Sequence, residues 1–252
     1  MAGSGAYRDE LQHLKNWRPF LLKNSGLPGP RGNLDLAQAV AELATEQQAN
    51  ELLSIPTELA PENSPEVFLV FCGLTSLGML AARGQHEHFA RLRSFASDGR
   101  WRVREAVAIA LQYVGDADMA LVLRTLGVWA KGNWYEKRAV AAALAEPRLL
   151  RDEANARQVL GIFDHITRDM TTAPDRRDES YKVLRQSMGY CWSVAAAAAP
   201  AEGKALMETW FGCRDTDIQW VMKENLKKNR LLKAAPDWTL YWRKQLARKP
   251  KV

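Results

Sequence analysis

The chain has 252 residues, of which 47% are hydrophobic and 25% are charged. This composition is ordinary for a folded soluble protein, and the length suits one large domain or two small ones. Its three cysteines are widely spaced and odd in number, which argues against a disulfide framework and for a reducing compartment. The first ten residues contain no apolar run, so we expect no signal peptide and a cytoplasmic protein.

Helix-forming residues dominate the chain, because Ala, Leu, Glu, Arg and Lys are frequent and no stretch alternates apolar and polar residues for long. We therefore expect an all-α fold. Residues 24–33 hold three glycines and two prolines, which predicts a loop. This loop divides the chain into an N-terminal helix and loop, residues 1–34, and a single helical domain, residues 35–252.

The next signals predict a buried helix. Asn63-Ser64-Pro65 offers a cap followed by proline at the first helical position. Residues 68–82 are the most apolar of the chain, but they are too few to span a bilayer, which takes about 20 residues, so we expect a core helix and no membrane partner. Later breaks are predicted near Gly84, Asp98-Gly99, Gly115-Asp116, Lys131-Gly132, Pro147, Pro174, Pro200 and Pro236. Helices of about 10 to 20 residues between short turns predict stacked helical hairpins.

A segment led by an aromatic residue recurs along the chain. The clear copies are Asp98-Gly-Arg-Trp101-Arg-Val-Arg104-Glu105, Lys131-Gly-Asn-Trp134-Tyr-Glu-Lys137-Arg138 and Asp217-Ile-Gln-Trp220-Val-Met-Lys223-Glu224, and a weaker copy is built on Tyr181. The four aromatic residues lie 33, 47 and 39 residues apart, close to the period of two-helix repeats. Asp precedes the aromatic residue by three positions in three copies, where it can cap a helix. We therefore expect a HEAT-like α-solenoid, a curved superhelix of stacked antiparallel hairpins.

Within each copy, the aromatic residue shares a helix face with the residues three, four and seven positions later. Trp101 thus projects with Arg104 and Glu105, Trp134 with Lys137 and Arg138, and Trp220 with Lys223, Glu224 and Lys227. In one interpretation, each Trp wedges into the next hairpin and each Glu forms a salt bridge. In the other, these faces line a concave groove, with Trp against a sugar or base and the cations on phosphates.

The C-terminal thirty residues are strongly basic. Residues 223–252 contain ten Lys and Arg and two acidic residues, a net charge of +8, whereas the whole chain carries +6. Such a segregated basic end suits a polyanion-binding protein, because phosphate neutralisation with counterion release supplies sequence-independent affinity. A tail that only aids solubility has the same composition. We interpret Lys223 and Lys227 as the end of a basic stripe and residues 243–251 as a solvated end.

The repeat motifs resemble those of a known family. Trp101-Arg-Val-Arg-Glu105-Ala-Val, Lys137-Arg138-Ala-Val-Ala, Val221-Met-Lys223-Glu-Asn225-Leu and Ala235-Pro236-Asp237-Trp238 are similar, in this order, to successive repeats of the bacterial HEAT-like DNA alkylation repair proteins of the AlkC/AlkD type. The resemblance covers roughly residues 65–248. The chain departs from the family pattern at Met222-Lys223, where Val-Arg is expected, and at Glu136, where a small aliphatic residue is usual.

The resemblance implies that the protein is a DNA glycosylase, which hydrolyses the N-glycosidic bond of cationic alkylpurines without flipping the base into a deep pocket. A carboxylate would stabilise the oxocarbenium-like sugar and orient water, and a Trp ring would favour the cationic base. Glu105 with Trp101 is the first candidate pair, Glu224 with Trp220 is the second, and Trp134 is a further candidate. The candidate DNA contacts are the cations Arg102, Arg104, Lys137, Arg138, Arg185, Lys223, Lys227 and Lys228.

The expected partner is double-stranded DNA, bound by a monomer in the cytoplasm or at the nucleoid, and no cofactor is expected. No metal ion is expected either, because His86 and His88 point in different directions on a helix and no cysteine has ligand spacing. Two alternatives stay open. The chain could be a non-catalytic HEAT scaffold for protein or nucleic acid, or a structural repeat protein whose basic tail aids solubility.

Overall fold

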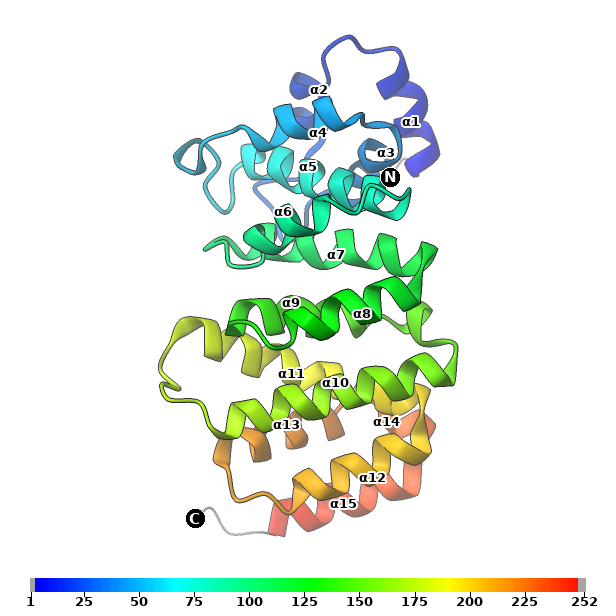
Figure 1. Cartoon of the computed structure of the whole chain (residues 1–252), viewed down its shortest axis with the longest axis vertical. Coiled ribbons are helices and arrows are strands. Elements are labelled where there is room, and N and C mark those ends of the chain that lie inside the picture. The colour runs from blue at the N-terminus through cyan, green and yellow to red at the C-terminus, as the bar shows by residue number, and fades with distance from the viewer. Residues whose placement is uncertain (1–2, 249–252) are drawn as a thin grey trace. The chain divides into compact units, whose positions relative to one another are not determined.

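The computed structural model describes residues 3–248, and all regular structure within them is helical, which confirms the all-α prediction for this part of the chain (Figure 1). The helices group into two compact units, Met1–Asp118 and Met119–Val252. This division differs from the predicted one at residue 34. The helices that precede residue 34 pack against later helices of the first unit and form no part of their own.

The first unit is built around one apolar helix, α5 (Pro65–Ala82), which packs against α2, α3, α4, α6 and α7. Most of its residues are buried, since neighbours cover it on nearly every side. The bounds of its companions are α1 (Ser4–Gln12), α2 (Arg18–Asn24), α3 (Leu34–Leu43), α4 (Glu46–Leu53), η1 (Thr57–Leu59), α6 (His88–Phe95) and α7 (Trp101–Ala117).

The predicted core helix is therefore confirmed as α5. Ser64 occupies its N-cap position and Pro65 its first turn, although the Ser64 hydroxyl forms no cap hydrogen bond. Among the described residues, α5 is the one helix long and apolar enough to cross a membrane, and 78% of it is buried inside the protein. Such burial is typical of the core helix of a soluble protein.

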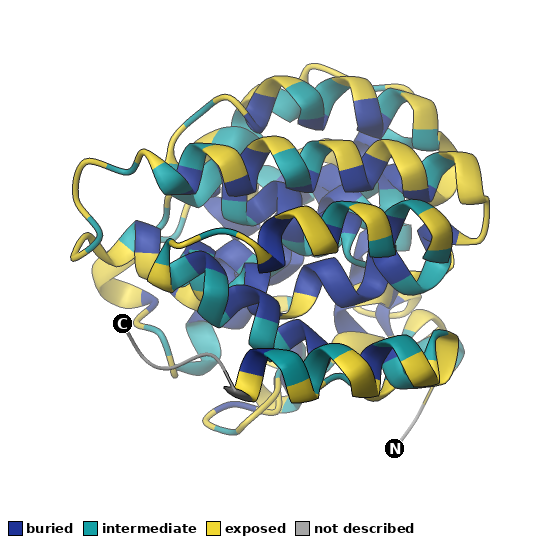
Figure 2. Ribbon diagram, turned by 90° about the horizontal axis from the view of Figure 1, so that it is seen from below, coloured by how far each residue is buried: buried dark blue, intermediate teal, exposed yellow. Residues whose placement is uncertain are grey.

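The second unit has two layers of helices. Helices α9 (Trp134–Leu144), α11 (Glu179–Ala198) and α13 (Thr216–Leu226) pack side by side, and α10 (Glu153–Thr171) packs against α8 (Met119–Trp129) and α12 (Pro200–Phe211). The remaining elements are η2 (Pro147–Leu150), α14 (Asn229–Ala234) and α15 (Pro236–Arg248). Figure 2 shows the resulting pattern, in which helices carry buried residues on one side and exposed residues on the other.

Most predicted breaks coincide with helix ends. The loop predicted over residues 24–33 joins α2 to α3, and the prolines at 200 and 236 begin α12 and α15. The break predicted near Gly115-Asp116 falls slightly later, because α7 includes both residues, continues to Ala117 and leaves the helical conformation at Asp118. A single glycine costs a helix only about 1 kcal/mol, and the buried face of α7 outweighs this cost.

Two helical glycines of the second unit have opposite surroundings. A Cβ atom on Gly203 in α12 would lie 2.5 Å from Ala196 Cα in α11, so this glycine permits the close approach of the two helices. A Cβ atom on Gly161 in α10 would have no atom within 4 Å. The two positions are a matched pair for testing how tightly the layers pack.

We expect Gly203→Ala to destabilise the protein by about 1–3 kcal/mol, because the new methyl group must push α12 away from the α11 backbone. Gly161→Ala should stabilise it by up to about 1 kcal/mol, because alanine is the better helix former and open space receives its methyl group. Urea unfolding followed by circular dichroism measures both values. Equal effects at the two positions would contradict the packing described here.

Candidate functional site

A pocket of about 300 Å³ opens in the first unit where the α2–α3 loop, α5 and α7 meet. We call it the Trp101 pocket. Trp101 and Glu105, one turn apart at the start of α7, both line it, as their helical spacing predicts. The other lining residues are mostly apolar or aromatic: Leu27, Pro30, Arg31, Gly32, Leu34, Val67, Phe68, Phe71, Arg102 and Ile109. The pocket thus combines one carboxylate with a half-exposed indole ring and apolar walls.

The start of α7 is held by residues far away in the sequence. The backbone N–H of Trp101 donates to Glu62 Oε2 at 2.6 Å, in the loop before α5. Buried Arg102 donates to the carbonyl oxygens of Glu62, at 3.2 Å, and of Gly29, at 2.7 Å, in the α2–α3 loop. Both loops are therefore fastened to the helix that carries Trp101 and Glu105.

Arg102 also defines the surroundings of the indole ring. Its guanidinium carbon lies 4.4 Å from the centroid of the Trp101 ring, while Trp101 remains 44% exposed. The carboxylate oxygen Oε1 of Glu62 lies 3.5 Å from Arg102 Nε and forms an ion pair with this guanidinium. Arg31, an exposed residue of the α2–α3 loop, adds a second cation to the pocket wall.

The cations three positions after Trp101 and Trp134 are buried. Arg104 Nη1 donates to the carbonyl oxygens of Asp98, at 2.6 Å, and Gly99, at 2.8 Å. Lys137 Nζ donates to Gly132 O at 2.6 Å and lies 3.3 Å from an Asp169 carboxylate oxygen. These two side chains and Arg102 were predicted to contact DNA. All three are at most 6% exposed, and their charged groups bind protein carbonyls.

The aromatic residues of the second unit lie between neighbouring helices. The Trp134 ring meets the buried Tyr181 ring edge-on, with centroids 5.5 Å apart. The Trp220 ring lies against the backbone of α11 at Gly189, where its atoms come within 3.0 Å of the position of a Cβ. The guanidinium carbon of Arg185 lies 3.9 Å from the centroid of the Trp220 ring. Both tryptophan rings therefore pack against a neighbouring helix, α11.

An ionic network joins the starts of α11 and α13. Asp217 accepts a hydrogen bond from the Tyr181 hydroxyl at 3.0 Å, and its carboxylate lies 2.7 Å from Arg185 Nε and 3.3 Å from Arg176 Nη1. Arg176 also donates to both carboxylate oxygens of Asp215. The predicted DNA contact Arg185 is thus fixed between Asp217 and the Trp220 ring.

Helix caps follow the prediction at one of three aspartates. Asp178 accepts hydrogen bonds from the first turn of α11, as predicted. Asp98 instead binds Arg100, and Asp215 caps α13 in place of Asp217 by accepting from the backbone N–H groups of Asp217 and Ile218. Burial alone would raise the pKa of Asp215, but the hydrogen bonds from Arg176 and from the helix start lower it below its ordinary value.

The lowered pKa of Asp215 predicts that the free energy of unfolding depends on pH in the acidic range. A carboxylate whose pKa is lower in the folded state than in the unfolded state, about 3.9, stabilises the fold above that value and loses this contribution as the pH falls through the folded pKa. We expect the free energy of unfolding to decrease below about pH 4, and the decrease to be smaller in Asp215→Asn. Urea unfolding between pH 7 and pH 3 tests this, and parallel pH curves for the two proteins would refute it.

A basic surface with an exposed aromatic residue lies near the middle of α11. Tyr190 is 40% exposed, and the Lys228 ammonium and Arg230 guanidinium lie 5.8 and 5.1 Å from its ring centroid. We call these three residues the Tyr190 cluster. Lys228 was predicted, whereas Tyr190 and Arg230 were missed because neither belongs to a repeat motif. The two cations lie at the start of α14, three helices further along the chain, so that no local sequence pattern links them to Tyr190.

The remaining predicted residues lie along α9 and α13. Lys227 is exposed and forms an ion pair with Glu224, the second catalytic candidate, so that this carboxylate is engaged on the helix surface. Lys223 and Arg138 are half-buried. Arg243 was predicted to be solvated, but its Nε donates to Leu226 O at 2.7 Å and closes the end of α13. Lys249 and Lys251 lie outside the described residues.

Among residues 3–248, no three His, Cys, Asp or Glu side chains group closely enough to hold a metal ion. No protein-family model matches the chain, and no curated protein sequence matches it.

Proposed function

We propose that the chain is a HEAT-like repeat protein that binds double-stranded DNA and acts in alkylation repair, with the Trp101 pocket as its site. The paired layers of the second unit support the repeat fold, because α9, α11 and α13 pack side by side while α8, α10 and α12 form the other layer. The observation that carries the activity is the joint presence of Trp101 and Glu105 in one base-sized pocket. The protein would act as a cytoplasmic monomer, close to its DNA substrate.

The chemistry that we propose needs no cofactor. An alkylated purine is a cationic leaving group, so that the bond from C1′ to the base nitrogen breaks with its electron pair moving to the purine, which becomes neutral. Glu105 stabilises the positive charge that develops on the sugar and orients a water molecule. The water oxygen then bonds to C1′, and its proton passes to the carboxylate and to solvent. The indole ring of Trp101 attracts the cationic base by about 0.5–2 kcal/mol.

One observation favours a second candidate, a DNA-binding scaffold without activity. Arg102 lies over the Trp101 ring and Arg31 lines the same pocket, so that two cations stand where a cationic base would bind. Glu62 neutralises only the first of them. Like charges repel, and a pocket that Arg31 dominates suits a phosphate better than an alkylpurine. The two candidates differ in one measurable property, the release of free base.

For the enzyme, we expect release of 3-methyladenine or 7-methylguanine from methylated duplex DNA, measured by liquid chromatography of the free bases. Glu105→Gln should slow this release by about 10²–10³, the usual cost of losing one charge-stabilising group. Glu224→Gln, which alters the surface ion pair with Lys227, should keep full activity. Binding of DNA without release of any base would leave the scaffold as the function, and loss only in Glu224→Gln would move the site to α13.

For DNA binding itself, we expect affinity to fall steeply with salt, with a slope of about −0.9 per phosphate contacted. Lys223→Glu combined with Lys227→Glu should weaken binding and reduce this slope by about 2. Arg214→Glu is the matched control, since this exposed cation precedes α13 and lies at its opposite end. Fluorescence anisotropy with a labelled duplex measures both quantities, and affinity that ignores salt would rule out the basic surface.

A further inference from the structure

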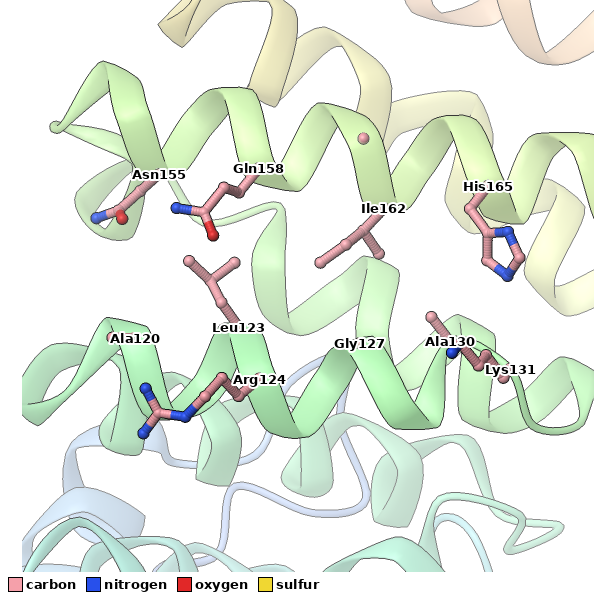
Figure 3. A pocket seen from close by; sticks show the side chains of 11 residues that line it. Ala120, Leu123, Arg124, Gly127, Ala130, Lys131, Asn155, Gln158, Ile162 and His165 are labelled. Atoms are coloured by element: carbon pink, nitrogen blue, oxygen red, sulfur yellow. The ribbon is translucent and has the colours of Figure 1, made fainter.

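A further hollow lies in the second unit. It is a groove of about 540 Å³ between α8 and α10, which run side by side in the same direction (Figure 3). Leu123 from α8 and Ile162 from α10 both point into it, as Figure 3 shows. We call it the α8–α10 groove. It belongs to the layer of α8, α10 and α12, whereas Trp134, Tyr181 and Trp220 belong to the other layer.

The groove exists because glycines replace side chains along its floor. Gly127 in α8 and Gly161 in α10 both line it, and a Cβ atom on either would have no atom within 4 Å. A glycine inside a helix costs about 1 kcal/mol relative to alanine, and neither of these two is needed for a close approach of helices. Two such glycines facing one hollow therefore keep space open at a cost in stability.

The ends of the groove are cationic. Arg124 and Asn155 lie at one end, and Lys131 and His165 lie at the other, as Figure 3 shows. Among the described residues, neither the Arg124 side chain nor the Lys131 side chain has a hydrogen-bond or ion-pair partner, and both residues are exposed. No acidic residue is among those that line the groove, and an Asp169 carboxylate oxygen lies 3.6 Å from His165 Nε2.

The spacing of these cations matches that of an α-helix. Arg124 and Lys131 are seven residues apart, so that they stand about two turns, or about 10 Å, apart along α8. Two carboxylates seven residues apart on a partner helix have the same separation and share one face. Between them, small or aliphatic side chains would fill the space over Leu123, Ile162 and the two glycines.

We propose that the α8–α10 groove binds an amphipathic helix of a partner protein, with two acidic residues seven positions apart that flank an apolar stripe. This is the mode in which a helix lays its apolar face into a groove, here with charge complementarity at both ends. A nucleic-acid backbone suits the groove less well, because its centre is apolar and would bury charged phosphates without partners.

The test uses the full chain and a phage-displayed library of 16-residue helical peptides in which one face is varied. We expect enriched peptides to carry Asp or Glu at two positions seven apart, with Ala, Leu or Met between them. A fluorescent copy of the most enriched peptide is then titrated by anisotropy. Gly161→Leu should abolish binding, because leucine fills the floor, and Arg124→Glu and Lys131→Glu should each weaken binding about tenfold or more.

Gly161→Ala is the control, since its single methyl group leaves most of the groove open, and melting temperatures show that each variant is folded. Failure to enrich any peptide, enrichment without the acidic pair, or unchanged binding to Gly161→Leu would each overturn the proposal. Duplex DNA is titrated in parallel. A loss of DNA affinity in Gly161→Leu would assign the groove to nucleic acid instead, whereas unchanged DNA affinity together with lost peptide binding supports a protein partner.

Discussion

The turns before α7, α9, α11 and α13 depend on one recurring contact, a long side chain that donates to a backbone carbonyl five or six residues earlier. The donors and acceptors are Arg104 with Asp98 and Gly99, Lys137 with Gly132, Arg176 with Thr171, and Gln219 with Cys213. Carbonyl groups at helix ends and in turns have no partner within the helix, and burying them unpaired is costly. Because each donor comes from the following helix or from the loop that leads into it, the contact also holds that helix against its turn.

This contact decides which cations are available to a ligand. At the Trp101 and Trp134 copies of the repeat, the residue three positions later closes the turn, so that Arg104 and Lys137 are buried. At the Trp220 copy, Gln219 donates to the turn carbonyl, so that Lys223 does not make this contact. The same logic applies to the pocket of the first unit. Arg102 donates to carbonyl groups of two loops, whereas Trp101 is partly exposed and borders the pocket together with Glu105.

The fold was more predictable than the site, and particular residues show why. Proline cannot continue a helix, so that Pro200 and Pro236 mark helix starts whatever surrounds them. Glycine only weakens a helix, and α7 continues past Gly115 to Ala117 because the burial of its apolar face outweighs the low helix propensity of glycine. Capping depends on the exact first residue of a helix. Helix α13 begins two residues earlier than predicted, so that Asp215 caps it and Asp217 binds Tyr181 and two arginines.

The sequence by itself determined the helical class, most helix boundaries and the recurrence of an aromatic residue with a cation one turn later, because these follow from local propensity and from the period of 3.6 residues. It also determined that Trp101 and Glu105 share a helix face. Only the tertiary structure decided whether such a face meets solvent or a neighbouring helix. Trp101 borders a pocket because the distant α2–α3 loop and α5 leave space there, whereas Trp134 and Trp220 meet the residues of α11. Periodicity describes one helix, and the exposure of its side chains depends on elements that are remote in the chain.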